Sequence, residues 1–407
     1  MTYYKAVIYH KVKVHSFQET PSCFNRKTIR YFSHRLIVSS GIRAGGFLFD
    51  FSPMELYNNK NSSKKHKGEN IIPAIIAFLM SVIIALGING TPTQYDKPID
   101  NYNGGDPFIC EDENGTYYTF TTGGGIDIFQ LESYEEVNVT RKETVFWAGE
   151  SGTVKDIWAP EIHKIGDRWY IIACGVFSED AVPRGSMPMA SGNDVYEDFY
   201  RYAFVLESSS EDIFSDYAFK GILAPDGLNN IDGTYLVKDE KLYYVCSAYL
   251  ATGFQAMYIC EMENPYTLKT DENGRHNAVE ISRPQYLWET RGWSVNEGPA
   301  ALYKDGKTYI VYSASGFSSG NYCMGLLTLT GDDVLDKNSW VKTPVSVLSH
   351  QPLKKIYNPG HCSFLYRDNG DIIMVYHANG ARKFDRSPQR LTYIKPIEFR
   401  YGIPCFR

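Results

Sequence analysis

A short structural unit that recurs five times constrains the fold of this chain more than any other feature. Each copy has a polar or charged residue beside Gly or Pro, then an apolar strand, a turn of Asp, Glu, Asn or Gly, and a second strand rich in Tyr, Trp or Val. The copies begin near Asp106, Glu161, Asp232, Glu297 and His361. These residues are roughly 55 to 70 positions apart, which leaves room for two further strands in each copy.

Four strands repeated five times predict an all-β fold, a five-bladed β-propeller with four-stranded antiparallel blades. Aromatic residues make up 14% of the chain, and β-branched and aromatic strand patterns outweigh any helical period, so we expect almost no helix. In a propeller the innermost strand of each blade runs beside the central channel. The five starting residues should therefore converge at one end of that channel.

The first part of the chain differs in composition from the rest. Residues 1–70 carry twelve Lys or Arg against four Asp or Glu, a net charge of +8, whereas the whole chain has a formal net charge of −6. They show no clear hydrophobic period, and we interpret them as a basic, poorly ordered leader. The remaining chain is acidic and would repel nucleic acid. We expect no nucleic-acid partner and no organic cofactor.

Residues 71–88 form the one long apolar run, and lysines precede it. This pattern is typical of a secretory signal peptide, although the run is also long enough for a signal anchor, and a buried core helix is a further alternative. We expect the following part of the protein to lie outside the cytoplasm, either secreted or membrane-anchored. Residues 89–100 are predicted to be a linker and residues 101–407 to form the propeller.

The cysteines do not indicate a disulfide framework or a zinc site. Seven of the eight follow the leader, none forms a close CxxC pair, and most lie in apolar strand runs. We expect mostly buried thiols, with at most one or two disulfides.

Three of the repeated units begin with a carboxylate directly before Gly or Pro, at Asp106, Asp232 and Glu297. Each alone is an ordinary turn sequence. At the matching ends of converging strands, they indicate a pocket in which one ionised carboxylate activates water and one protonated carboxyl group donates to a leaving group. A third carboxylate nearby raises the pKa of the acid. This arrangement is what hydrolysis of a glycosidic bond requires.

The ordered motifs DPF, WAPEIH, IDGTYL, NEGPA and PGHCSF, within residues 100–405, resemble those of glycoside hydrolase family 43. The resemblance implies that Asp106 is the general base and Glu297 the general acid. It also implies that Asp232 orients the acid and modulates its pKa. His361, in PGHCSF, matches a channel histidine close to a bound metal ion, commonly calcium, with sodium as the alternative.

The resemblance further implies inversion of the anomeric centre by a single displacement. Arg390, in RLTYIKP, is similar to an arginine that is a candidate substrate contact in the family, and Trp158, at a strand mouth, is a second candidate. Each of these residues also has a structural reading. Trp158 is equally consistent with touching the substrate and with not touching it, whereas Trp169 is interpreted as packed between blades. His361 is alternatively a satisfied core histidine, and Glu161 is interpreted as a channel or structural carboxylate without a catalytic role.

The choice of substrate rests on likeness in the loops. YYTFTTGGGIDIFQ and DIWAPEIH resemble the branch of the family that releases terminal L-arabinofuranose from α-1,5-arabinan of plant cell walls. β-Xylosidase and endo-arabinanase share the same catalytic set and are the alternatives. Outside the enzymes, the alternative is a non-catalytic carbohydrate-binding propeller, against which the three intact carboxylates argue. We expect a monomer that acts on arabinan- or arabinoxylan-type chains.

Overall fold

The structure is a computed structural model, and the part of it described here excludes several segments. The described residues are 93–100, 104–186, 188, 200–250, 253–380 and 389–406, together with four three-residue strands nearer the N-terminus. The chain divides into two compact units, Met1–Ala74 and Ile75–Arg407. The predicted signal or anchor at residues 71–88 lies outside the described residues, as does most of the predicted leader.

The first unit contains two short antiparallel pairs among its described residues. The strands are β1 (Arg30–Phe32) with β2 (Arg35–Ile37), and β3 (Ile42–Ala44) with β4 (Phe47–Phe49).

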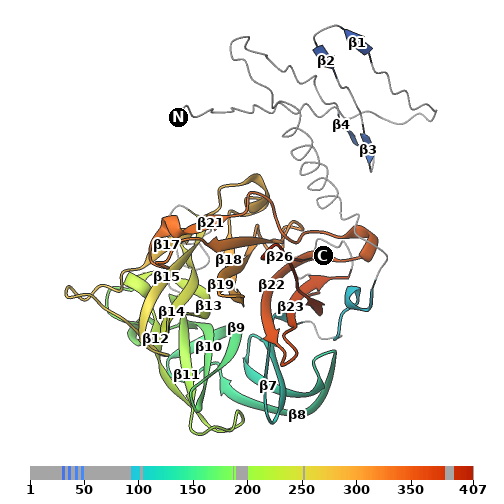
Figure 1. Cartoon of the computed structure of the whole chain (residues 1–407). Helices are drawn as coiled ribbons and strands as arrows, with labels where there is room; N and C mark the ends of the chain where they lie inside the picture. Colours follow the sequence, from blue (N-terminus) through green and yellow to red (C-terminus); the bar gives the residue numbers. More distant parts are fainter. Residues whose placement is uncertain are drawn as a thin grey trace. The chain divides into compact units, whose positions relative to one another are not determined.

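The second unit is built from five antiparallel sheets arranged around a centre (Figure 1). Blade 1 contains β5 (Gly105–Asp112), β6 (Gly115–Thr121), β7 (Gly125–Ser133) and β8 (Glu136–Trp147). Blade 2 contains β9 (Thr153–Ile165), β10 (Arg168–Phe177), β11 (Tyr200–Ser208) and β12 (Tyr217–Leu223). Blade 3 contains β13 (Asn230–Lys238), β14 (Lys241–Tyr249), β15 (Gln255–Asn264), β16 (Thr267–Leu268) and β17 (Val279–Ser282).

The remaining strands complete the ring. Blade 4 contains β18 (Asn296–Lys304), β19 (Lys307–Ala314), β20 (Cys323–Leu329) and β21 (Trp340–Lys342). Blade 5 contains β22 (Tyr357–Tyr366), β23 (Ile372–Asn379) and β24 (Leu391–Pro396), and a separate hairpin follows, β25 (Glu398–Arg400) with β26 (Ile403–Cys405). The first strand of each blade contacts the first strands of both neighbouring blades, in the cycle β5, β9, β13, β18, β22 and back to β5.

The predicted five-bladed β-propeller is therefore confirmed. Three blades have four strands, whereas blade 3 has five and blade 5 has three among the described residues. Helical residues in the described part are limited to 3-10 turns of three residues each. These turns are η1 (Gln94–Asp96), η2 (Glu179–Ala181), η3 (Pro225–Gly227), η4 (Leu287–Glu289), η5 (Lys337–Ser339) and η6 (Pro352–Lys354).

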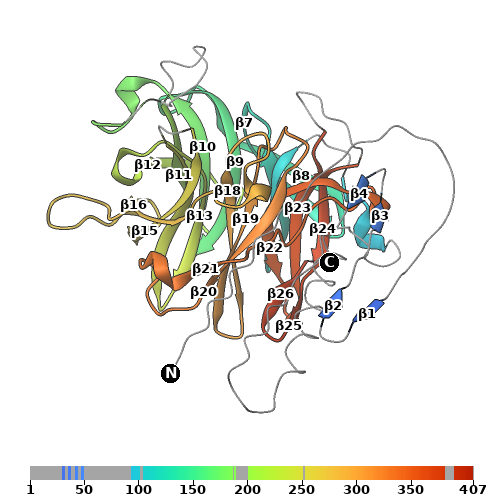
Figure 2. The ribbon, with the colours of Figure 1, turned by 90° about the horizontal axis from the view of Figure 1, so that it is seen from above.

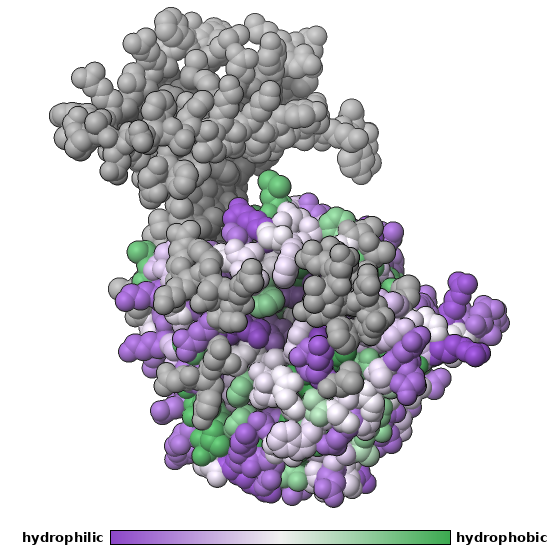
Figure 3. Space-filling view, turned by 180° about the vertical axis from the view of Figure 1, so that it is seen from behind, coloured by the Kyte–Doolittle hydropathy of each residue, from purple (hydrophilic) through white to green (hydrophobic). Residues whose placement is uncertain are grey.

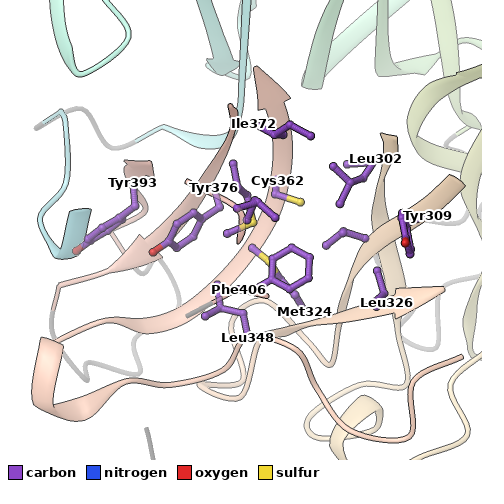
Figure 4. Close-up of a cluster of buried hydrophobic side chains, with 14 of the residues drawn as sticks. Leu302, Tyr309, Met324, Leu326, Leu348, Cys362, Ile372, Tyr376, Tyr393 and Phe406 are labelled. Atoms are coloured by element: carbon purple, nitrogen blue, oxygen red, sulfur yellow. The ribbon is translucent and has the colours of Figure 1, made fainter. Parts of the chain in front are cut away.

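The hydrophobic core consists of five clusters, each shared by two adjacent blades. The side chains facing one another between blades 4 and 5 include Leu302, Met324, Cys362 and Tyr376 (Figure 4). Equivalent clusters join blades 1 and 2, 2 and 3, 3 and 4, and 5 and 1. Since each blade buries side chains on both of its faces, the sheets are stabilised mainly by burial of apolar surface between neighbours.

The segment before blade 1 takes part in closing the ring, although the sequence predicts a linker there. The Ile99 N–H donates to the carbonyl of Thr392 in β24 (2.8 Å), and the Ile99 carbonyl accepts from Val137 N–H in β8 (3.1 Å). The buried Asp100 accepts hydrogen bonds from the Tyr118 hydroxyl (2.9 Å) and from Thr392 N–H (3.1 Å). Blades 5 and 1 lie side by side in both ribbon views (Figure 1; Figure 2).

The described cysteines form no disulfides, and the described surface seen in Figure 3 is mixed in hydropathy. All seven described cysteines are free, and five of them are buried. On the face seen in Figure 3, hydrophobic and hydrophilic residues are interspersed. Within the described ranges, no helix combines the length and the apolar character that crossing a membrane demands.

Candidate active site

Every innermost strand carries a residue in the left-handed backbone region, at a point where its register with the second strand shifts, and β9 and β22 each carry a second one, Asp156 and Asn358. Such a bulge bends the strand and re-aims the side chains beside it. In each blade one such residue lies at or within two positions of the predicted starting residue: Asp106 (φ 59°), Ala159 (φ 46°), Asp232 (φ 54°), Gly298 (φ 54°) and His361 (φ 44°). The five bulges are the structural counterpart of the repeated unit in the sequence.

In two blades the predicted starting residue is not the bulge residue. Glu297 stands one position before Gly298, and Glu161 stands two positions after Ala159. Glu161 contacts His163 instead, with 2.8 Å between its Oε2 and the Nε2 of that ring. Equivalence between blades therefore holds for the backbone, while the position of the carboxylate relative to the bulge differs from blade to blade.

Asp106 is surrounded by donors. The Thr121 hydroxyl donates to its Oδ2 (2.7 Å), Arg390 Nη1 donates to its Oδ1 (3.0 Å), and His361 Nδ1 lies 3.1 Å from the same Oδ1. Burial alone would raise the pKa of this carboxyl group. The charges of Arg390 and His361 outweigh that effect and hold the pKa well below its usual range. Asp106 is therefore ionised and can accept a proton.

Glu297 is in the opposite situation, because it forms no ion pair with any described residue. Its Oε1 accepts a hydrogen bond from the Tyr322 hydroxyl (2.8 Å), and its Oε2 accepts one from Gln255 Nε2 (3.1 Å). Burial, followed by repulsion from Asp232, raises the pKa of Glu297 to about 8. At neutral pH this group is mostly protonated and can donate a proton.

The pKa of Asp232 lies between the pKa values of Asp106 and Glu297. Its Oδ2 accepts a hydrogen bond from Gly298 N–H (3.0 Å) and lies 3.9 Å from His361 Nδ1. Burial raises the pKa of Asp232 to about 6, although His361 opposes this rise. Asp232 thus accepts a hydrogen bond from the backbone next to Glu297 and, when ionised, raises the pKa of the Glu297 carboxyl group.

His361 joins two of the carboxylates and is the residue to consider for a metal ion. Asp106 and Asp232 raise its pKa to about 9 against the effect of burial, which would lower it. Its Nδ1 contacts both carboxylates, and at neutral pH the ring is protonated, so it would approach a metal ion through water and not as a direct ligand. In the described ranges, no three His, Cys, Asp or Glu side chains could share a metal ion. Since Ca²⁺ prefers oxygen ligands, these residues fit an ion that is held mainly by water close to His361.

The two predicted substrate contacts have different surroundings. Arg390 pairs with Asp106, and its guanidinium lies 5.5 Å from the centre of the Phe317 ring. The Arg201 guanidinium covers one face of Trp158 at 3.5 Å from the ring centre. That face of the half-buried Trp158 is closed to a sugar.

Sequence reasoning missed five residues of this region: Tyr322, Gln255, His377, Trp293 and Phe317. His377 Nδ1 accepts a hydrogen bond from Asp106 N–H (3.1 Å), and a histidine within the apolar strand run IIMVYHA was a signal for it. Trp293 and Phe317 are 60% and 37% exposed and lie at the same end of blade 4 as Glu297. Exposed aromatic rings beside buried carboxylates are suited to stacking on sugar rings.

Comparison with known proteins agrees with this geometry. The family model described as glycosyl hydrolases family 43 matches residues 95–404. The extracellular exo-α-(1→5)-L-arabinofuranosidase of Streptomyces chartreusis is 30% identical over 312 residues, which are 73% of this chain and 86% of that protein. The α-L-arabinofuranosidase 43 of Humicola insolens is 30% identical over 321 residues, which are 74% of this chain but only 61% of that protein.

A solved structure gives the same result. The crystal structure of α-L-arabinofuranosidase from Lactobacillus brevis matches with a TM-score of 0.65 and 29% identity, covering 77% of this chain and 98% of that chain. The match to the family model spans all five blades and includes Asp106, Asp232, Glu297 and His361. The chain therefore belongs to glycosyl hydrolases family 43 and is a glycoside hydrolase.

Proposed function

We propose that this protein is an inverting exo-acting glycosidase that releases terminal L-arabinofuranose from α-1,5-arabinan or arabino-oligosaccharides. Asp106 acts as the general base and Glu297 as the general acid. The observation that carries the proposal is the contrast between the two buried carboxyl groups. Arg390 and His361 pair with Asp106 and hold it ionised, whereas Glu297 lies near Asp232 and forms no ion pair with a described residue.

In the reaction, Asp106 accepts a proton from a water molecule as that water attacks the anomeric carbon. Glu297 gives its proton to the glycosidic oxygen as the bond to the leaving sugar breaks. Asp232 keeps Glu297 protonated through like-charge repulsion and orients it through the hydrogen bond from Gly298 N–H. Arg390 holds Asp106 in position and is available to a substrate hydroxyl.

The arabinofuranose specificity is supported by the relatives. Those with 30% identity have arabinofuranosidase names, and the Streptomyces chartreusis protein is named as exo-acting on α-(1→5) linkages. A more distant relative, from Aspergillus clavatus, is 24% identical and named as a probable endo-acting arabinosidase. Exo action on arabinan is therefore the proposal that the nearer relatives favour, and xylosidase or endo action is what the assay must exclude.

We also propose that a structural calcium or sodium ion lies in the central channel, close to His361 or in contact with it through water. Such an ion would add a fixed positive charge close to Asp106 and Asp232.

We propose export from the cytoplasm, since the Streptomyces relative is named as extracellular. We expect the protein to act as a monomer.

The test is sugar release by residues 90–407 from p-nitrophenyl α-L-arabinofuranoside, p-nitrophenyl β-D-xyloside and linear arabinan, with Glu297→Gln as the matched variant. We expect only arabinose, released from arabinan as monomer, and a large loss in the variant on arabinan. Xylose release would indicate a xylosidase, and short arabino-oligomers would indicate endo action. If both proteins were inactive on every substrate, the enzymatic roles of Asp106 and Glu297 would be refuted.

A further inference from the structure

Tyr322 is a buried side chain that touches the proposed acid directly. It stands immediately before β20 and is 1% exposed, and its hydroxyl donates a hydrogen bond to Glu297 Oε1 (2.8 Å). Glu297 itself lies on β18, so the hydrogen bond joins the innermost strand of blade 4 to the segment that precedes the third strand of that blade. The acid is thus fixed from outside its own strand.

The ring of Tyr322 also reaches towards the proposed base. It stacks on the ring of His377 in β23, with 5.6 Å between ring centres and 5° between ring planes. His377 in turn accepts the backbone N–H of Asp106 at its Nδ1. Burial, together with the charge of Arg390, holds the pKa of His377 well below its usual value, so this imidazole is neutral and its Nδ1 can accept. Tyr322 and His377 together connect Glu297 to Asp106.

The backbone around this pair leaves the Tyr322 ring little freedom to shift. A Cβ atom at Gly360 would lie 1.9 Å from Tyr322 Cε1, so the ring packs directly against the backbone of β22. Gly360 is the strand partner of His377 and directly precedes His361. The ring is therefore confined by the same strands that carry the other groups of the site.

We propose that Tyr322 is a positioning residue that, with His377, fixes the proton of Glu297 relative to the base Asp106. The inference rests on the proposed function of these two carboxyl groups. Inversion requires the acid and the base to be held at a separation that admits one water molecule. A displacement of about 1 Å in such a group can cost about 100-fold in rate.

Gln255 is the other donor to Glu297, and it does not make the same connection. Its Nε2 donates to Glu297 Oε2 and to the Ser247 hydroxyl (3.3 Å), and that hydroxyl donates to the carbonyl of Asn296. These contacts join blade 3 to the acid's own strand. Of the two donors, Tyr322 is the one linked to the partner of Asp106.

The first test is Tyr322→Phe, which keeps the stacked ring and removes only the hydroxyl. We expect kcat/KM on arabinotriose to fall by about 10- to 100-fold, because its leaving sugar needs protonation. On p-nitrophenyl α-L-arabinofuranoside, whose leaving group needs little protonation, activity should stay within about threefold of wild type. An equal loss on both substrates, or no loss on either, would overturn the proposal.

The matched control is Tyr376→Phe, another buried tyrosine in the strand that carries His377 (Figure 4). Its hydroxyl has no hydrogen-bond partner in the described part of the protein. This variant should hydrolyse both substrates like wild type. A selective loss on arabinotriose in Tyr376→Phe as well would show that removing any buried hydroxyl has this effect, and would also overturn the proposal.

His377→Asn tests the other half of the pair, because the Asn side-chain oxygen can replace Nδ1 as acceptor while the stacked ring is lost. We expect the same selective loss on arabinotriose, with an unchanged melting temperature. Wild-type activity on both substrates would refute the role of the stack. Glu297→Gln, assayed alongside, separates the positioning role of Tyr322 from the proposed function of Glu297 as the acid. If it shows the selective loss and Tyr322→Phe does not, only the positioning role fails, whereas an unaffected Glu297→Gln refutes the proposed function.

Discussion

At the scale of single residues, the site depends on giving two similar carboxyl groups opposite protonation states. Asp106 has Arg390 at 3.0 Å, while the hydrogen bonds that Glu297 receives from described residues come from neutral groups, Tyr322 and Gln255. Burial by itself would raise both pKa values, so the cations beside Asp106 make the difference. One chemical type can therefore serve as base and acid in one pocket.

This account predicts the pH dependence of activity. Glu297 must be protonated to act, and its pKa is about 8, so kcat should fall as the pH rises above that value. Asp232→Asn removes the negative charge that raises this pKa, so the basic limb should move to lower pH by about one unit. A pH–rate profile on arabinotriose checks both expectations. An unmoved basic limb in Asp232→Asn would mean that Asp232 does not tune the acid.

A second residue-scale prediction concerns the exposed ring of Trp293. Trp293→Ala should raise KM for arabinotriose by about two- to tenfold and leave kcat nearly unchanged, because a lost stacking contact weakens binding without touching the reacting atoms. Trp147→Ala is the matched control, since that ring is similarly exposed, at 57%, but lies in the outermost strand of blade 1. Equal effects of the two substitutions in steady-state kinetics would contradict a role for Trp293 in binding.

The sequence identified the site residues at the starts of the inner strands and missed those that other strands and segments contribute. Asp106, Asp232 and His361 occupy bulges of inner strands, and turn dipeptides mark two of those places. Tyr322 and His377 belong to the segment before a third strand and to a second strand, so their approach to the site depends on register and on blade packing. A sequence pattern specifies neither the register of the strands nor the packing of the blades.

At the scale of strands and turns, the repeated unit predicted the hairpins well. In the copy that begins near Glu297, the turn of the repeated unit lies at Lys304 to Lys307, with Lys304 opposite Lys307 and positive φ at Asp305 (50°) and Gly306 (73°). This is the backbone of a two-residue hairpin that matches strand twist. The number of outer strands was less predictable, because these strands range from two residues in β16 to twelve in β8, and blades 3 and 5 depart from four strands among the described residues.

The closing segment gives a prediction at this scale. Asp100→Ala would leave the buried Tyr118 hydroxyl and Thr392 N–H without their shared acceptor, which should cost about 2–3 kcal/mol of stability. The melting temperature should fall by several degrees. Glu398→Ala is the control, because it removes an exposed ion pair with Arg400 and should change little. Equal melting temperatures for wild type and Asp100→Ala would refute the role of this segment in closure.

At the scale of the whole molecule, five interblade clusters hold five inner strands around one axis, so that their bulges bring distant residues together. Asp106 and His361 are separated by about 250 positions in the sequence yet lie 3.1 Å apart, oxygen to nitrogen. The repeat predicted this convergence. The closure through Ile99 and Asp100 was not predictable, because their segment is polar and turn-rich and shows no strand pattern.

The most direct test of the central claim is the anomeric configuration of the first sugar released from an α-L-arabinofuranoside, followed by proton NMR before mutarotation. If Asp106 activates water in a single displacement, β-L-arabinofuranose must appear first. If the α-anomer appeared first, the reaction would proceed through a covalent intermediate, and the assignment of Asp106 as base and Glu297 as acid of an inverting enzyme would be contradicted.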